Sequence, residues 1–153
     1  KVNPPLRSKD HMQACLEAVV DGTIDVISSG HQPKSLEKKM QELDAAPYGM
    51  TTLDTVLAQV VTCLVRPGRL SWSRAIECLS TQPARVLGIP GGSLTVGQPA
   101  DVIVVDPEAT WTVTPEACYS HSQNTPLLDQ SLTGRVRQVW IDGVLKHSLV
   151  RSS

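Results

Sequence analysis

The sequence predicts a fold of the α/β plus β class, and three observations support this prediction. Up to about residue 89, helical patterns alternate with a strand-like segment. From residue 90 onward the patterns are strand-like and end in a tight hairpin. Helix–strand alternation followed by a run of strands is typical of a parallel α/β layer that is joined to a small β-domain. We therefore divide the chain into residues 1–89 and residues 90–153.

The first predicted helix covers residues 8–21. Ser8 is a favourable N-cap, Gly22 is a typical C-terminal stop, and the apolar residues between them recur at helical spacing. A buried strand is predicted at residues 23–27, where Ile24, Val26 and Ile27 follow the glycine. A polar loop that contains His31 comes directly after this strand.

Three further helices are predicted before the β-rich part. Residues 53–64 have apolar side chains at the spacing of a helix with one buried face, and Thr51 or Thr52 can cap it. A second helix is predicted from Ser71 to residue 79. A third, short helix is predicted from Pro83, because proline is favourable in the first helical turn, and it ends before Gly88.

The second part of the chain has the patterns of strands. An apolar run ends at Pro107, a β-branched and aromatic segment follows, and a later run alternates polar and apolar residues. Asp142 and Gly143 form a typical two-residue hairpin turn. The predicted strands cover residues 100–106, 111–113, 135–141 and 144–146.

Composition excludes several classes of function. The 14 basic and 15 acidic residues are nearly balanced, so we expect no nucleic-acid partner. The chain has no apolar run of about 18 residues, so we expect no membrane partner. The 4 cysteines are widely spaced, and we expect reduced, mostly buried thiols in a cytoplasmic protein.

Seven segments, taken in order, carry a resemblance to a known family. They are residues 1–7 (Lys-Val-Asn-Pro-Pro-Leu-Arg), 21–27, 46–49 (Ala-Pro-Tyr-Gly), 82–85 (Gln-Pro-Ala-Arg), 92–101, 122–126 and 134–136. In this order they resemble the C-terminal third of a dihydroorotase, a cyclic amidohydrolase of pyrimidine biosynthesis. The resemblance implies that residues 1–89 are the C-terminal βα units of a metal-dependent (β/α)8 barrel, and that residues 90–153 are part of the small β-sandwich domain beside it.

The length of the chain agrees with this interpretation. A complete eight-stranded α/β barrel needs about 200 residues or more, whereas the first part of this chain supplies roughly one or two strand–helix units. Such a piece leaves strand edges unpaired and helix faces uncovered. We therefore expect the chain to be the C-terminal part of a larger protein.

The resemblance also implies a mechanism for the family. Zinc lowers the pKa of a bound water, and a carboxylate takes its proton. The hydroxide attacks the ring amide of dihydroorotate, and the reverse reaction closes carbamoyl aspartate. Most zinc ligands of the family lie upstream of the region that this chain resembles, and we predict none for this chain alone. The C-terminal third should contribute one aspartate, at the end of the last strand.

At position 30 the chain departs from the family. The family has Asp-His-Ala-Pro-His where this chain has Gly-His-Gln-Pro-Lys at residues 30–34. Gly30 has no side chain to bind a metal or accept a proton. Three interpretations of Gly30 are open. The protein is non-catalytic and Gly30 is a loop residue, or an active enzyme uses another base, or the glycine was introduced deliberately. His31 is either a metal ligand or a structural loop histidine, and we favour the second.

Four further residues are candidate substrate contacts. Lys34 stands where the family has a histidine that helps to bind the substrate carboxylate. It either attracts an anion as a point charge or is a solvated loop lysine. Asn3 is a substrate-contacting amide or a turn residue before two prolines. Tyr48 and Gly49 lie where the family's backbone groups hold the substrate ring.

Two hypotheses on function remain open. The first is a dihydroorotase homologue that has lost catalysis because of Gly30 and Lys34. Such a chain could act as a structural partner of aspartate transcarbamoylase, or it could form a homodimer. The second is an active cyclic amidohydrolase whose other ligands lie upstream, in the remainder of its own barrel. A free-standing β-rich binding module is disfavoured by the strand–helix units at the start of the chain.

Overall fold

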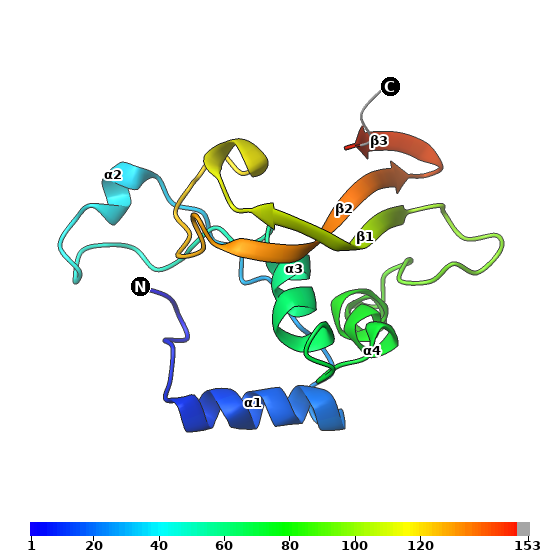
Figure 1. The fold of residues 1–153 in the computed structure, drawn as a ribbon, viewed down its shortest axis with the longest axis horizontal. Coiled ribbons are helices and arrows are strands. Elements are labelled where there is room, and N and C mark those ends of the chain that lie inside the picture. The colour runs from blue at the N-terminus through cyan, green and yellow to red at the C-terminus, as the bar shows by residue number, and fades with distance from the viewer. Residues whose placement is uncertain (150–153) are drawn as a thin grey trace.

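The structure of the protein is a computed structural model that describes residues 1–149, and its elements are stacked in three layers (Figure 1). The helical elements are α1 (Lys9–Asp21), α2 (Leu36–Lys39), α3 (Val56–Val60), the π-helical turn η1 (Val61–Val65), α4 (Trp72–Ile76), the π-helical turn η2 (Glu77–Thr81), α5 (Gln82–Leu87) and the 3-10 turn η3 (Pro115–Ala117). The strands are β1 (Val102–Thr112), β2 (Ser131–Ile141) and β3 (Val144–Ser148). The antiparallel sheet β1-β2-β3 lies above α3 and α4, and α1 lies below them.

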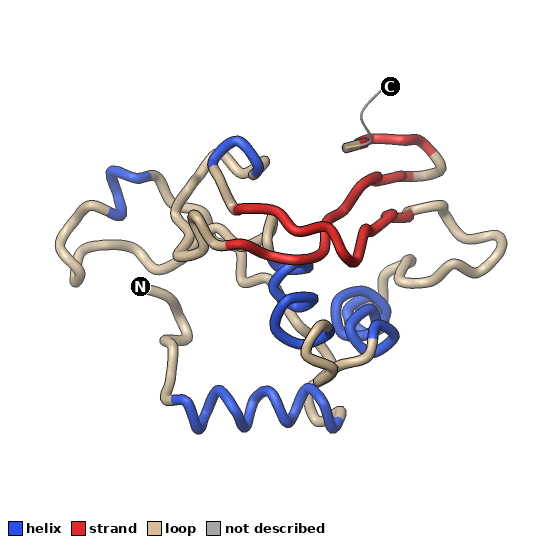
Figure 2. Tube along the Cα trace, in the orientation of Figure 1, coloured by secondary structure: helices blue, strands red, loops and turns tan. Residues whose placement is uncertain are grey.

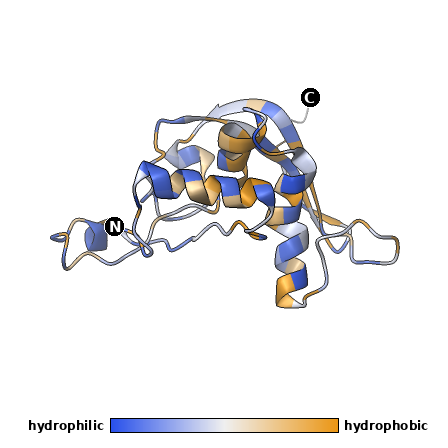
Figure 3. Ribbon diagram, turned by 90° about the horizontal axis from the view of Figure 1, so that it is seen from below, coloured by the Kyte–Doolittle hydropathy of each residue, from blue (hydrophilic) through white to orange (hydrophobic). Residues whose placement is uncertain are grey.

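Helix α1 forms as predicted. The Ser8 hydroxyl accepts a hydrogen bond from the His11 amide, and Gly22 ends the helix with a φ of +90°. Its apolar face is only partly covered, because Val19 is buried whereas Met12 is 62% exposed. Figure 3, seen from below, shows hydrophobic and hydrophilic residues alternating along this helix.

The predicted strand at residues 23–27 is wrong. This segment joins no β-ladder, and a strand needs a neighbouring strand to pair its backbone. Two of its backbone amides are held by helices instead: that of Ile24 donates to Ala18 O at 2.8 Å, and that of Ile27 donates to Cys78 O at 3.0 Å. Both isoleucines pack against the core cluster between α1, α3 and α4.

The helix predicted at residues 53–64 begins later, at Val56, and ends as the π-helical turn η1. The predicted caps are also wrong. No side chain caps the helix at Thr55, and the Thr51 hydroxyl donates instead to Ser122 O at 2.9 Å. The turn that precedes the helix is closed by the carbonyl of Thr52, which accepts from the Thr55 and Val56 amides.

The two helices predicted on either side of residue 81 form one helical run, α4–η2–α5. Ser71 caps its start by accepting from the Arg74 amide at 3.2 Å, as predicted, and Gly88 ends it with a φ of +64°. Pro83 lies inside the run because the wider π-helical turn η2 directly precedes α5. A π-turn changes the hydrogen-bond spacing and so accommodates a residue that has no N–H to donate.

The loop that follows Gly88 returns the chain to the sheet (Figure 2). It is attached to the helical run where the Thr81 hydroxyl donates to Gly92 O at 2.8 Å. A Cβ atom at Gly92 would lie 2.9 Å from the Cα of Thr81, so only glycine fits this approach.

Strand β1 passes through Pro107, and the predicted stop at this residue is wrong. The register of β1 against β2 is irregular between Asp106 and Thr110, where proline needs no ladder hydrogen bond. The Asp106 carboxylate closes this bulge by accepting from the Glu108 and Ala109 amides. The predicted strands at 100–106 and 111–113 are therefore one strand. The hairpin turn is confirmed, with φ values of +49° at Asp142 and +73° at Gly143.

Helix and sheet meet at a point of close approach between η1 and β2. Gly134 has a φ of +93°, and a Cβ atom there would lie 2.9 Å from the Cγ2 of Val61. The Thr62 hydroxyl accepts from the Thr133 amide at 2.8 Å and donates to the Thr133 carbonyl at 3.3 Å. The guanidinium of Arg66 donates to the Thr133 hydroxyl at 3.1 Å. Ala58, Val113 and Leu132 form the buried core beside this contact.

The cysteines are free thiols, but the expectation that most are buried is wrong. Cys78 is buried and Cys118 is half-buried, whereas Cys15 and Cys63 are exposed. Burial raises the pKa of both the Cys78 and the Cys118 thiol, so these two groups are poor nucleophiles. In the part of the chain that the structure describes, no helix combines the length and the apolar composition needed to cross a membrane.

Replacement of Gly134 by alanine tests the helix–sheet approach. We expect Gly134→Ala to lower the free energy of unfolding by about 3 kcal/mol, because backbone strain adds to overlap with Val61. Gly68→Ala is the matched control, since Gly68 also has a positive φ, of +73°, with no atom near its Cβ position. We expect the control to cost about 1 kcal/mol. Equal costs in urea unfolding would contradict a steric role for Val61.

The ion pair between Asp106 and Arg137 predicts a pH dependence of stability. The carboxylate and the guanidinium are 2.8 Å apart, and the hydrogen bond from Arg137 is the main reason that the pKa of Asp106 lies below its ordinary value. The ion pair stabilises the folded state above the pKa of an aspartate in the unfolded chain, about 3.9. This stabilisation is lost as the pH falls towards the lower pKa of Asp106 in the folded protein. We expect Asp106→Asn to reduce the fall in Tm between about pH 5 and pH 3. Arg137→Gln should reduce it similarly, and an unchanged fall in both variants would refute the assignment.

Candidate functional site

Most candidate residues lie where four loop segments meet, which we call the loop cluster: residues 1–3, 28–34, 47–53 and 122–124. Three backbone hydrogen bonds join these segments. The Gly49 amide donates to Lys1 O at 3.0 Å, and the Gln32 amide donates to Met50 O at 3.0 Å. The Thr51 amide donates to Asn124 O at 2.8 Å. Segments that are distant in sequence are thus held together before any side chain is considered.

Gly30 lies in the first of these loops in a left-handed conformation, with a φ of +59°. The hydroxyls of Ser28 and Ser29 shape the loop by accepting from the amides of Gly30 and His31. A Cβ atom at Gly30 would meet no heavy atom within 4 Å. Lack of space for a Cβ atom therefore does not explain the glycine, although any other residue at this φ carries backbone strain.

His31 is half-buried, and its ring faces the next segment of the cluster. Its Nδ1 atom lies 3.2 Å from the Thr52 amide nitrogen and 3.0 Å from the Leu53 amide nitrogen, and it accepts from both. The favoured interpretation of His31 as a structural loop histidine agrees with these contacts. The Thr52 side chain is also buried, and its hydroxyl has no hydrogen-bond partner among the described residues.

Gly49 is buried, and both of its backbone polar groups are used within the protein. Its amide donates to Lys1 O, and its carbonyl accepts from Lys39 Nζ at 3.2 Å and from Asn124 Nδ2 at 3.0 Å. A Cβ atom at Gly49 would overlap the carbonyl oxygen of Gln32. Gly49 therefore lets two loops approach each other closely, whatever else its backbone contacts.

Tyr48, Asn3 and Lys34 surround this contact. The ring of Tyr48 is 50% exposed, and Lys1 Nζ lies 4.8 Å from its centroid. Asn3 is exposed on the same segment as Lys1. Lys34 is half-buried, and its carbonyl accepts from the Ser122 hydroxyl at 2.6 Å. Their roles in substrate binding remain predictions.

The donor set of the loop cluster does not fit the zinc site that the resemblance implies. Gly30 offers no ligand atom, and the Nδ1 of His31 is already engaged by two backbone amides. Within residues 1–149, no three side chains of His, Cys, Asp or Glu are gathered closely enough to hold a metal ion. No step of a metal-assisted reaction can therefore be derived from this chain's own side chains.

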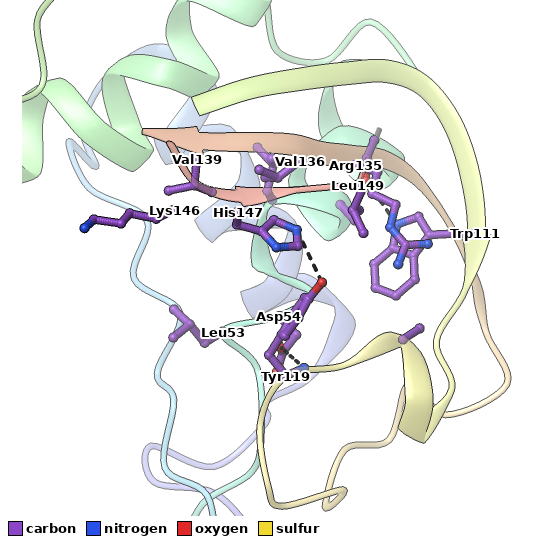
Figure 4. A pocket seen from close by; sticks show the side chains of 14 residues that line it. Leu53, Asp54, Trp111, Tyr119, Arg135, Val136, Val139, Lys146, His147 and Leu149 are labelled. Carbon is purple, nitrogen blue, oxygen red and sulfur yellow. Dashed lines mark hydrogen bonds between the residues drawn. The ribbon is translucent and has the colours of Figure 1, made fainter. Parts of the chain in front are cut away.

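A cavity of about 580 Å³ lies between the start of α3 and the hairpin β2–β3, outside the predicted site (Figure 4). The Asp54 carboxylate accepts from the Tyr119 amide at 2.9 Å and from the Ser120 hydroxyl. The Tyr119 hydroxyl and the Nε2 of His147 are 3.3 Å apart, and their rings meet edge to face. Most of the remaining wall is apolar.

Sequence patterns could not identify the residues of this cavity. Asp54 and Tyr119 are separated by 65 positions, and Tyr119 and His147 by 28, so only the fold brings them together. Arg135 on β2 also lines this cavity. Its guanidinium lies 4.7 Å from the centroid of the Trp111 ring, in a cation–π contact.

Comparison with known sequences gives one consistent result. A family model described as the amidohydrolase family matches residues 3–146. A putative dihydroorotase of Rhodopirellula baltica is 48% identical over 149 residues, which are 97% of this chain and 33% of that protein. The dihydroorotase of Syntrophotalea carbinolica is 44% identical over 97% of this chain and 35% of its own length. The chain spans about a third of the length of the curated relatives it matches.

Comparison with solved structures agrees with this result. The L-hydantoinase (dihydropyrimidinase) of Arthrobacter aurescens has a TM-score of 0.85 and 27% identity, over 99% of this chain and 36% of that one. The dihydropyrimidinase of Brevibacillus agri has a TM-score of 0.88 and 23% identity, over 94% of this chain and 32% of that one. The fold of this chain is thus that of a part of these larger proteins.

Replacement of Gly49 tests the close approach at the centre of the loop cluster. We expect Gly49→Ala to lower the free energy of unfolding by about 3 kcal/mol and to expose residues 28–34 to hydrogen exchange, because the new methyl group overlaps Gln32. Gly91→Ala is a closely matched control, since both glycines have a φ of +123° but Gly91 has no atom near its Cβ position. If both variants lost equal stability, strain alone would explain the effect.

Proposed function

The chain belongs to the amidohydrolase family, and from this premise we propose that it forms part of a dihydroorotase-like cyclic amidohydrolase of pyrimidine biosynthesis. The observation that carries the proposal is identity of 48% and 44% to two dihydroorotases over 97% of the chain. Its substrates in the proposal are dihydroorotate and carbamoyl aspartate, which the family interconverts. The proposed compartment is the cytoplasm.

In this proposal the chain corresponds to the C-terminal third of the enzyme. Residues 1–89 complete the catalytic barrel, and residues 90–153 contribute to the flanking β-sandwich. The half-covered apolar face of α1 supports this assignment, because Met12 and Val20 are 62% and 47% exposed, and such a face is usually packed against other structure. The zinc that activates water in the family would be held, in this proposal, by residues outside this chain.

Gly30 and Lys34 determine what this chain can contribute to the reaction. A glycine cannot accept a proton, so the general base that the family places at position 30 is missing. The ammonium group of Lys34 can attract the carboxylate of a substrate as a point charge, although it cannot reproduce the fixed planar donor geometry of an imidazole. We therefore propose that catalysis is impaired while the loop cluster keeps the family's backbone arrangement.

The glycine at position 30 also favours one alternative function. A homologue without the carboxylate at position 30 can persist as a non-catalytic structural partner of aspartate transcarbamoylase. The backbone groups of Gly49 are satisfied within the protein, so the loop cluster does not require a bound substrate to hold its shape. Measured turnover of dihydroorotate by the full-length protein would exclude this alternative.

Restoring the two family side chains tests the proposal. We expect Gly30→Asp with Lys34→His, in the full-length protein and with its upstream metal ligands intact, to raise the rate of dihydroorotate hydrolysis about 100-fold, the lower end of what a general base contributes. A side chain can begin at this position without overlap, because no heavy atom lies within 4 Å of the Cβ position at Gly30.

The matched control introduces the same carboxylate elsewhere. Gly91 is a second loop glycine with open space at its Cβ position, so Gly91→Asp adds an equal charge away from the loop cluster. We expect it to leave the rate unchanged. A restored double variant that folds, binds zinc and shows no gain would refute the assignment of position 30 as the missing base.

A further inference from the structure

We propose that His31 is a positioning residue that fixes the loop carrying position 30 against the turn before α3. Its Nδ1 atom accepts from the Thr52 amide at 3.2 Å and from the Leu53 amide at 3.0 Å. The loop of Gly30 and the turn of Thr52 are about 20 residues apart along the chain, and this imidazole is a side-chain link between them. The inference rests on the proposed function in one respect only, the assignment of the family's general base to position 30.

The contacts determine the protonation state of the ring. Both partners are backbone N–H groups, which can only donate, so Nδ1 must carry a lone pair. A neutral imidazole with an unprotonated Nδ1 has its proton on Nε2. In this tautomer Nδ1 is occupied and Nε2 is a hydrogen-bond donor, so His31 does not act as a metal ligand while the link is in place.

The link satisfies two amides of the turn before α3, three and four positions before the helix begins at Val56. The first amides of a helix and of the turn before it have no partner within the helix, and a side chain usually accepts from them. Thr55 supplies no such side-chain bond to α3, and Thr52 is only 4% exposed, so water cannot readily satisfy its amide. His31 accepts from outside the helix and so satisfies two amides at the start of this turn.

A second attachment lies on the other side of position 31. The Gln32 amide donates to Met50 O at 3.0 Å, so the loop is bound to the 47–53 segment by one side chain and by the adjacent backbone group. Gly30 directly precedes this double attachment. Any side chain placed at position 30 is therefore held one residue from an anchored ring.

Three substitutions of His31 test whether the link depends on the position of the acceptor atom or only on the packing of the side chain. The Oδ1 of asparagine lies as many bonds from the backbone as the Nδ1 of histidine, whereas the acceptor of glutamine lies one bond further. His31→Asn should therefore keep the link, and His31→Gln and His31→Leu should break it. We expect the amides of Thr52 and Leu53 to exchange about tenfold faster in the Gln and Leu variants, and within about threefold of the native rate in His31→Asn.

The amides of α1 serve as the internal reference for these rates, since general unfolding would accelerate their exchange too. Ring-¹⁵N histidine spectra of the unchanged full chain give a second measurement that needs no variant to fold. At about pH 8, where histidine is ordinarily neutral, we expect the His31 signals of an Nε2–H tautomer, assigned by their loss in His31→Asn.

Three outcomes would overturn the proposal: native exchange rates in His31→Leu, equal rates in the Asn and Leu variants, or a proton on Nδ1. Neither measurement requires turnover. A failure here would therefore leave the proposed function untouched, and a chain without dihydroorotase activity could still show the link.

Discussion

The approach of η1 to β2 is the contact on which the arrangement of the molecule depends. Val61 packs where Gly134 has no side chain, and Thr62 pairs both backbone groups of Thr133. The contact needs a glycine at position 134 of β2, opposite Val61, and a hydroxyl at position 62 of η1, opposite Thr133. Because it fixes the helix against the sheet, it also fixes the turn at the N-terminal end of α3, which carries the amides that His31 accepts from. The sheet thus positions the loop cluster through α3 and the turn before it.

The loop cluster is joined mainly through backbone groups, so it does not depend on a side chain at position 30. Gly49 is satisfied by Lys1, Lys39 and Asn124, and none of these bonds involves position 30. Gly30 has no side chain, so the hydrogen bonds that join the loop segments form without any contribution from a side chain at position 30. The shape of the loop cluster therefore rests on atoms other than those of any side chain at position 30.

Local patterns predicted the elements whose determinants lie within a few residues. Ser8 and Gly22 delimit α1, and Asp142 with Gly143 makes the hairpin turn, because caps and tight turns are set by nearby backbone geometry. Local patterns failed where the partner is distant. The strand at 23–27 was predicted from its apolar residues, but a strand also needs a neighbour. Pro107 was predicted as a stop, but the bulge closed by Asp106 carries the strand past it.

The sequence by itself determined the family, the helix boundaries at Ser8, Ser71 and Gly88, and the absence of a carboxylate at position 30, since each depends only on residue identity and order. Only the tertiary structure decided the role of His31, the engagement of Gly49 and the cavity around Asp54 and Tyr119. These depend on hydrogen bonds across 20 or more positions, and the geometry of such bonds follows from how helices, loops and sheet pack together.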